Sequence, residues 1–160
     1  MNIEFMSLRI IHIVSGSFWV GSALFMVLFF LPRLRRLAPD TRDTVMEEVV
    51  GLWSTVSGVA AVVTIAAGMT LALRLRWGHL DTFLSSGWGW AILIGFISAI
   101  LSMALGGRFD STLRRIRSSH EGQPDAVETE RLVNSMTGSL RLSTLFVVIA
   151  AGSMASARFV

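Results

Sequence analysis

Apolar residues gather in four long stretches of the chain, at about 8–31, 49–73, 82–107 and 136–157. A helix of about 20 apolar residues crosses a hydrocarbon core of roughly 30 Å, and each stretch reaches that length. A helix also satisfies its own backbone hydrogen bonds, as lipid requires. The pattern therefore predicts an all-α fold, a four-helix transmembrane bundle that forms a single integral membrane domain over 1–160.

Two of the polar segments between these stretches also carry helix signals. Pro39 and Asp40 open one of them, followed by Asp43 and Glu47, which is typical of a helix start with acidic residues near its first turn. In the other, Asp125 is a candidate N-terminal cap ahead of the last stretch. We therefore expect helical extensions of the bundle on the side of these two segments, which the charge pattern assigns to the cytoplasm.

That charge pattern is an uneven distribution of arginine between the two ends of the predicted helices. Ten arginines lie at one end (33, 35, 36, 42, 108, 114, 115, 117, 131 and 141) and four at the other (9, 74, 76 and 158). Because cytoplasmic loops carry the excess of positive charge, the arginine-rich end is predicted to face the cytoplasm. In a bacterial inner (cytoplasmic) membrane, this multi-pass arrangement leaves both termini extracytoplasmic.

Composition narrows the possible chemistry. Hydrophobic residues make up 52% of the chain and charged residues 16%, against about 25% charged in soluble domains. The chain has no cysteine, lysine or tyrosine, which excludes thiolate metal sites, cysteine nucleophiles and Schiff-base lysines. The net charge of +3 comes from arginine-rich loops, which suit lipid headgroups better than nucleic acid, so no nucleic-acid partner is expected.

His12 is the strongest candidate for a functional residue. It is the only ionisable side chain between Ile10 and Leu31, and ionisable residues inside membrane helices are usually functional. Ser15, Gly16 and Trp19 share its helical face. A histidine above small residues and an aromatic ring suits a flat cofactor such as haem b. The alternative is a histidine that is hydrogen-bonded to a neighbouring helix.

A second set of possible ligands lies on the same predicted side of the membrane. His79 falls in the outer loop, so His12 and His79 can be joint ligands of one metal ion or haem iron. Met69 lies near the outer end of the second stretch, and thioether with imidazole suits copper. The alternatives are a solvated loop histidine and a methionine that fills space in apolar packing, with no cofactor at all.

The first stretch resembles a known group of membrane proteins. The residues that carry the resemblance are His12, Trp19, Gly21 and the segment LPRL at 31–34. In these features the chain is similar to the CopD-like copper-resistance membrane proteins and to their HemJ-like relatives. The resemblance implies a polytopic helical protein that is associated with haem or copper, and it implies His12 as the ligand.

Two functional hypotheses follow. In the first, the protein binds haem b or copper near the extracytoplasmic side and has a redox or electron-transfer accessory role. In the second, it is a non-catalytic accessory subunit that packs against other membrane subunits or forms a homo-oligomer. Small residues at four-residue spacing, such as Ala91, Gly95 and Ala99, favour close helix packing in either case. No set of catalytic residues is predicted, and the lipid bilayer is the expected surrounding.

Overall fold

A computed structural model describes most of the chain. The described residues are 3–34, 36–76, 83, 85–119, 126–157 and 159. Apart from short turns, they are helical, and no strand is found among them. The all-α prediction is therefore confirmed.

The helices follow one another in the order α1 (Ile3–Phe25), η1 (Met26–Phe30), α2 (Leu31–Leu34), α3 (Pro39–Val45), η2 (Met46–Val50), α4 (Gly51–Arg76), α5 (Gly87–Ser119) and α6 (Ala126–Ser156). The elements η1 and η2 are single π-helical segments inside longer helices. Successive elements without a gap form continuous rods, so the described chain consists of four long helices.

All four rods are long and apolar enough to cross a membrane. The candidate spans are Ile3–Leu34, Glu48–Leu75, Gly87–Phe109 and Asn134–Ser156. They confirm the four predicted stretches, as expected for a multi-pass integral membrane protein. The predicted helical extensions are also present, because α3 and η2 precede α4, α5 runs on to Ser119 and α6 begins at Ala126.

The third helix begins later than its apolar stretch suggested. The sequence placed the start of that span at about 82, but α5 begins at Gly87. The hydroxyl of Ser86 accepts a hydrogen bond from the backbone N–H of Gly89 (3.1 Å), which is the usual role of a serine at a helix N-terminus. A local cap, which hydropathy does not register, therefore sets this boundary.

The π-helical segment η1 directly precedes Pro32. The backbone N–H of Leu31 bonds to the carbonyl of Met26, which is the i→i+5 spacing of a π turn. Proline has no backbone N–H, so the carbonyl of Leu28 has no α-helical partner. The first rod thereby continues through the proline to Leu34.

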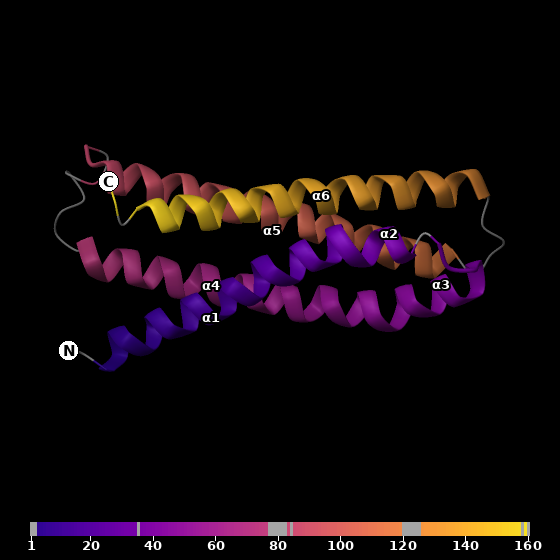
Figure 1. Cartoon of the computed structure of the whole chain (residues 1–160), viewed down its shortest axis with the longest axis horizontal. Helices are drawn as coiled ribbons and strands as arrows, with labels where there is room; N and C mark the ends of the chain where they lie inside the picture. Colours follow the sequence, from indigo (N-terminus) through magenta and orange to yellow (C-terminus); the bar gives the residue numbers. More distant parts are fainter. Residues whose placement is uncertain are drawn as a thin grey trace.

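The rods pack as two helix pairs. Figure 1 shows α5 running beside α6, while α1 crosses α4 at a shallow angle on the other side of the molecule. Contacts within each pair are far more extensive than those between α4 and α5. Both termini lie at the same end of the bundle in Figure 1, as the even number of rods requires.

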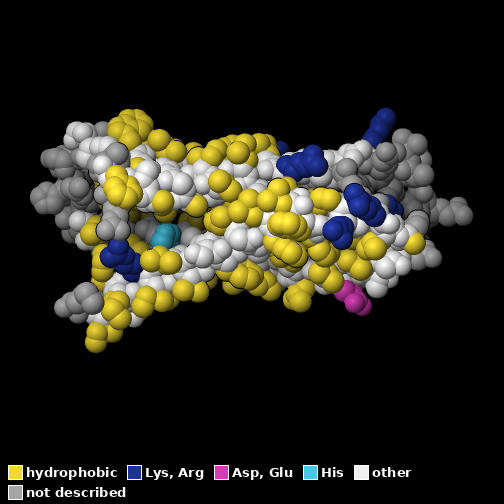
Figure 2. Space-filling view, viewed as in Figure 1, with side chains coloured by type: hydrophobic (Ala, Val, Ile, Leu, Met, Phe, Trp, Pro, Cys, Tyr) yellow, Lys and Arg dark blue, Asp and Glu magenta, His cyan; other side chains and the backbone are white. Residues whose placement is uncertain are grey.

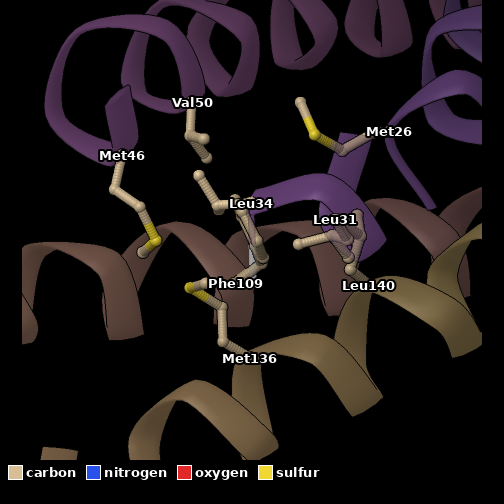
Figure 3. Packing of buried hydrophobic residues seen from close by; sticks show 8 residues of the cluster. All are labelled: Met26, Leu31, Leu34, Met46, Val50, Phe109, Met136 and Leu140. Atoms are coloured by element: carbon tan, nitrogen blue, oxygen red, sulfur yellow. The ribbon is translucent and has the colours of Figure 1, made fainter. Parts of the chain in front are cut away.

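Two apolar clusters hold the pairs together. The first lies at the end where α2 and η2 meet the other helices, and Figure 3 shows its residues pointing toward one another: Met26, Leu31, Leu34, Met46, Val50, Phe109, Met136 and Leu140. The second lies nearer the middle and consists of Trp19, Ala23, Ala60, Ala61, Ala99, Val147 and Ala150. Its many alanines let the helices approach closely.

The outer surfaces of the rods are apolar. Ile13 is 56% exposed and Leu52 67% exposed. Figure 2 shows hydrophobic side chains along most of the visible face, with arginine side chains (dark blue) mainly toward one end. In water such a surface would drive aggregation, so it is suited to contact with the lipid bilayer.

Candidate functional site

His12 projects from α1 toward α4. Its Nδ1 lies 2.8 Å from the backbone carbonyl oxygen of Thr64. A carbonyl oxygen only accepts hydrogen bonds, so Nδ1 carries the proton and donates. In the neutral imidazole the lone pair then lies on Nε2. The contact with Thr64 therefore fixes both the tautomer and the direction of the ring.

Gly68 provides the space for this ring. A Cβ atom at position 68 would lie 2.7 Å from Cε1 of His12 and 2.9 Å from Nδ1, well inside normal van der Waals contact. Any side chain at this position would push the ring away from Thr64. The glycine one turn after Thr64 is thus what allows His12 to reach a backbone carbonyl of α4.

Ser15 and Gly16 extend the same contact between α1 and α4. The hydroxyl of Ser15 donates to the carbonyl of Ile11 (2.6 Å) and lies 2.8 Å from Oγ1 of Thr64. A Cβ atom on Gly16 would lie 3.2 Å from Cγ2 of Thr64. Both residues therefore lie directly against α4, in the position of helix-packing residues.

The other residues singled out in the sequence lie elsewhere. Trp19 is 7% exposed and belongs to the central apolar cluster. Met69 follows Gly68 on α4 but is 40% exposed. His79 lies outside the described residues. Within the described ranges no group of three histidine, cysteine, aspartate or glutamate side chains is placed to hold a metal ion.

The second ring nitrogen of His12, Nε2, is available to bind a ligand. Nε2 has no hydrogen-bond partner among the described residues. It is also not fully buried, so part of its surface is accessible. Figure 2 shows a histidine side chain (cyan) inside a hollow between the two helix pairs. At the same end of the α1–α4 pair, Glu4 and Arg74 form an exposed ion pair (3.0 Å). The imidazole is thus oriented by α4, and its Nε2 is not bonded to any described residue.

Thr64 is the participant that the sequence did not reveal. His12 stands out in the sequence as an isolated ionisable group. Nothing in the sequence gives the register between α1 and α4, so the carbonyl that orients His12 was not predictable. A threonine one turn before a glycine was the only local sign.

Comparisons with models of known protein families, with curated proteins and with solved structures gave no match. The resemblance of the first helix to CopD-like and HemJ-like proteins therefore stays a prediction.

Proposed function

We propose that this multi-pass membrane protein holds one haem b group through Nε2 of His12, near the extracytoplasmic side, in a redox or electron-transfer accessory role. The observation that carries the proposal is the hydrogen bond from Nδ1 of His12 to the carbonyl of Thr64. Histidine ligands almost always donate their other ring N–H to a carbonyl, carboxylate or water. His12 has that arrangement, with the ligating nitrogen free.

The same geometry favours haem over copper. Haem iron needs only one axial side chain from the protein, with its four equatorial ligands supplied by the porphyrin. Copper(I) takes several soft ligands, and Met69, the thioether closest to the site in sequence, lies on an exposed part of α4. A single oriented imidazole meets the requirement of haem iron for one axial side chain.

The residues around His12 have positioning roles in this proposal. Thr64 orients the ring, and Gly68 leaves the space that the ring fills. Bound haem supplies one-electron chemistry, which none of the described side chains provides by itself. If haem is bound there, the apolar side chains around His12 would limit the access of water to the iron and so would influence its reduction potential.

The test is the haem and metal content of the protein purified in mild detergent. Extracted haem is measured as its pyridine complex, and copper by elemental analysis, in the wild type and in His12→Ala. His120→Ala is the matched control, since the sequence places His120 at the opposite side of the membrane. We expect close to one haem per chain in the wild type and in the control, and little in His12→Ala.

Two other outcomes would change the cofactor that we assign to the protein. Copper without haem, lost in His12→Ala, would make the site a copper centre with ligands beyond those described. Neither haem nor copper in the wild type would contradict the proposal. The accessory-subunit hypothesis would then stand, and co-purification with larger membrane subunits would be its test.

A further inference from the structure

Arg141 is a charged residue inside a helix that is apolar enough to cross a membrane. It is the only charged residue in the candidate span Asn134–Ser156 and lies about 10 Å along the helix from Asn134, at 1.5 Å per residue. Its side chain is exposed, and its guanidinium makes no hydrogen bond or ion pair within the described part of the chain. A charge at this depth is costly unless it reaches a partner or the polar edge of the membrane.

The direction of α6 brings the guanidinium of Arg141 toward that edge. Side chains of an α-helix tilt toward its N-terminus, and α6 begins at Ala126, outside the candidate span. Gly138 lies three residues before Arg141 on the same face, and a Cβ atom there would meet nothing within 4 Å. The long side chain of Arg141 therefore has open surface along which it can extend toward the polar end of the bundle.

Arg33 lies at a similar level on the neighbouring rod. Leu31 of α2 and Leu140 of α6 belong to one buried cluster, and Figure 3 shows them close together. Arg33 and Arg141 follow these two residues in the chain, so they lie within about one helical turn of the same level. Arg33 is also exposed and has no hydrogen-bond or ion-pair partner within the described residues. In the view of Figure 2, arginine side chains lie over both α2 and α6.

An apolar cleft adjoins Arg33 on the outside of the bundle. Its volume is about 400 Å³, and Arg33 is its only charged lining residue. Phe25 and Phe29 are more than half exposed, and their rings stack with centroids 6.1 Å apart. The remaining lining residues are also apolar and come from the same rod: Leu28, Phe30 and Pro32. Hydrocarbon walls with a cation at the edge match a molecule that has an acyl chain and an anionic head.

The charge of this surface decides which molecule fits it. A guanidinium binds phosphate oxygens through paired hydrogen bonds, and phospholipids present phosphate at the membrane edge with their acyl chains directed into the bilayer. A carboxylate on another membrane helix would first have to lose its own hydration. A zwitterionic lipid brings a cation that two arginines repel, so a lipid with net negative charge fits best.

We propose that an anionic phospholipid binds to the outer face of α2 and α6, with its phosphate held by Arg33 and Arg141 and one acyl chain against Phe29. The phosphate would neutralise two exposed cations for which the described residues provide no partner. The acyl chain would cover phenylalanine side chains that the fold leaves exposed. This inference does not depend on the haem site proposed above.

Native mass spectrometry of the delipidated protein in mild detergent tests the proposal, because it identifies each bound species by its mass. The protein is titrated with phosphatidylglycerol and, separately, with phosphatidylcholine that has the same acyl chains. Arg33→Gln and Arg141→Gln each remove one cation. Arg9→Gln is their matched control, since Arg9 is exposed in the other half of α1. Phe29→Ala shortens the wall of the cleft, with Phe18→Ala as its control at another exposed position of α1.

We expect one saturable phosphatidylglycerol adduct that forms at lower lipid concentration than the phosphatidylcholine adduct. Loss of one charge-assisted hydrogen bond should raise the dissociation constant for phosphatidylglycerol about 10-fold in Arg33→Gln and in Arg141→Gln. Arg9→Gln should bind as the wild type does. Phe29→Ala should weaken the binding of both lipids about 5-fold, because the acyl chain is common to them, and Phe18→Ala should weaken neither.

Equal affinity of the wild type for the two lipids would overturn the proposal, as would an unchanged dissociation constant in either Arg33→Gln or Arg141→Gln. An equal loss of affinity in Arg9→Gln would show a general effect of net charge and would also overturn it. A mass of two chains without lipid, dissociated in Arg33→Gln, would assign this face to a second copy of the chain instead. The haem content of the same samples reports on the proposed function separately.

Discussion

At the scale of single residues, the contact of His12 with α4 rests on two features that depend on each other. The ring of His12 fills the volume next to Gly68, and its Nδ1 reaches the carbonyl of Thr64 through that volume. A larger residue at position 68 and the hydrogen bond to Thr64 exclude one another. This dependence makes the arrangement testable without any knowledge of a ligand.

Gly68→Ala should destabilise the protein, although alanine is the better helix former. The new Cβ would displace the imidazole and remove the bond to Thr64, at a cost of about 1–3 kcal/mol. Gly58→Ala is the control, because a Cβ atom there meets nothing within 4 Å, and it should be neutral or stabilising by up to about 1 kcal/mol. The measurement is unfolding of each variant by denaturing detergent.

The double variant His12→Ala/Gly68→Ala tests the cause. If the imidazole is what the new methyl group displaces, the cost of Gly68→Ala should largely disappear when His12 is already alanine. The coupling free energy should be on the order of 1 kcal/mol or more. Strictly additive effects of the two substitutions would show that Gly68 and His12 act independently, contrary to the structure.

The sequence was sufficient to single out His12 but not to place it. An ionisable residue in an apolar stretch stands out from composition alone, whereas its partner Thr64 depends on the register of two helices. Ser15 and Gly16 share the face of His12 as the periodicity predicted, but that face is directed against α4. Periodicity gives the face of a helix, and the packing of the partner decides what that face contacts.

At the scale of helices, the two pairs use different contacts. In the α1–α4 pair, hydrogen bonds centre on Thr64. In the α5–α6 pair, Ser102 and Ser143 bond reciprocally. Each hydroxyl lies 2.9 Å from the backbone carbonyl of the other residue, and the two hydroxyls are 3.0 Å apart. Both serines are buried, so water does not replace these bonds when one is lost.

Removal of either serine should therefore weaken the α5–α6 pair. Ser102→Ala and Ser143→Ala should each lower the stability by about 0.5–1.5 kcal/mol, typical of hydrogen bonds between membrane helices. The double variant should cost about the sum of the two single variants, since each hydroxyl donates to a backbone carbonyl that the other substitution leaves in place. Ser17→Ala, at an exposed position of α1, should cause no measurable change. A single variant that costs as much as the double variant would contradict two separate bonds.

The helices were the most predictable level of this structure. Hydropathy alone gave all four spans, because lipid imposes length and apolarity on any helix that crosses it. It did not give the boundary at Gly87, where the cap by Ser86 decides, nor the π turn η1, where the N–H of Leu31 bonds to the carbonyl of Met26. Boundaries and irregular turns depend on single hydrogen bonds that an average over many residues does not resolve.

At the scale of the whole molecule, the arginine distribution predicts the orientation in the membrane. The described arginines at the end that carries α2 and α3 include Arg33, Arg36 and Arg42. The predicted excess of positive charge at this end assigns it to the cytoplasm. The opposite end, with both termini and the Glu4–Arg74 ion pair, is then predicted to face the extracytoplasmic side.

Because the chain contains no cysteine, single introduced cysteines report this orientation directly. Ser7→Cys and Ser111→Cys replace exposed residues near opposite ends of the bundle. A membrane-impermeant maleimide should label Ser7→Cys in intact cells and Ser111→Cys only after the membrane is opened. The reverse labelling pattern would place His12 on the cytoplasmic side and contradict the assigned orientation.

The measurement that tests the central claim most directly is a spectrum of His12→Gly with and without added imidazole. The wild type should show a Soret band that sharpens and shifts on reduction with dithionite. His12→Gly should lose this band, and free imidazole in the vacated space should restore it if His12 acts as the iron ligand. A normal Soret band in His12→Gly without imidazole would contradict ligation by His12, and no Soret band in the wild type would contradict haem binding altogether.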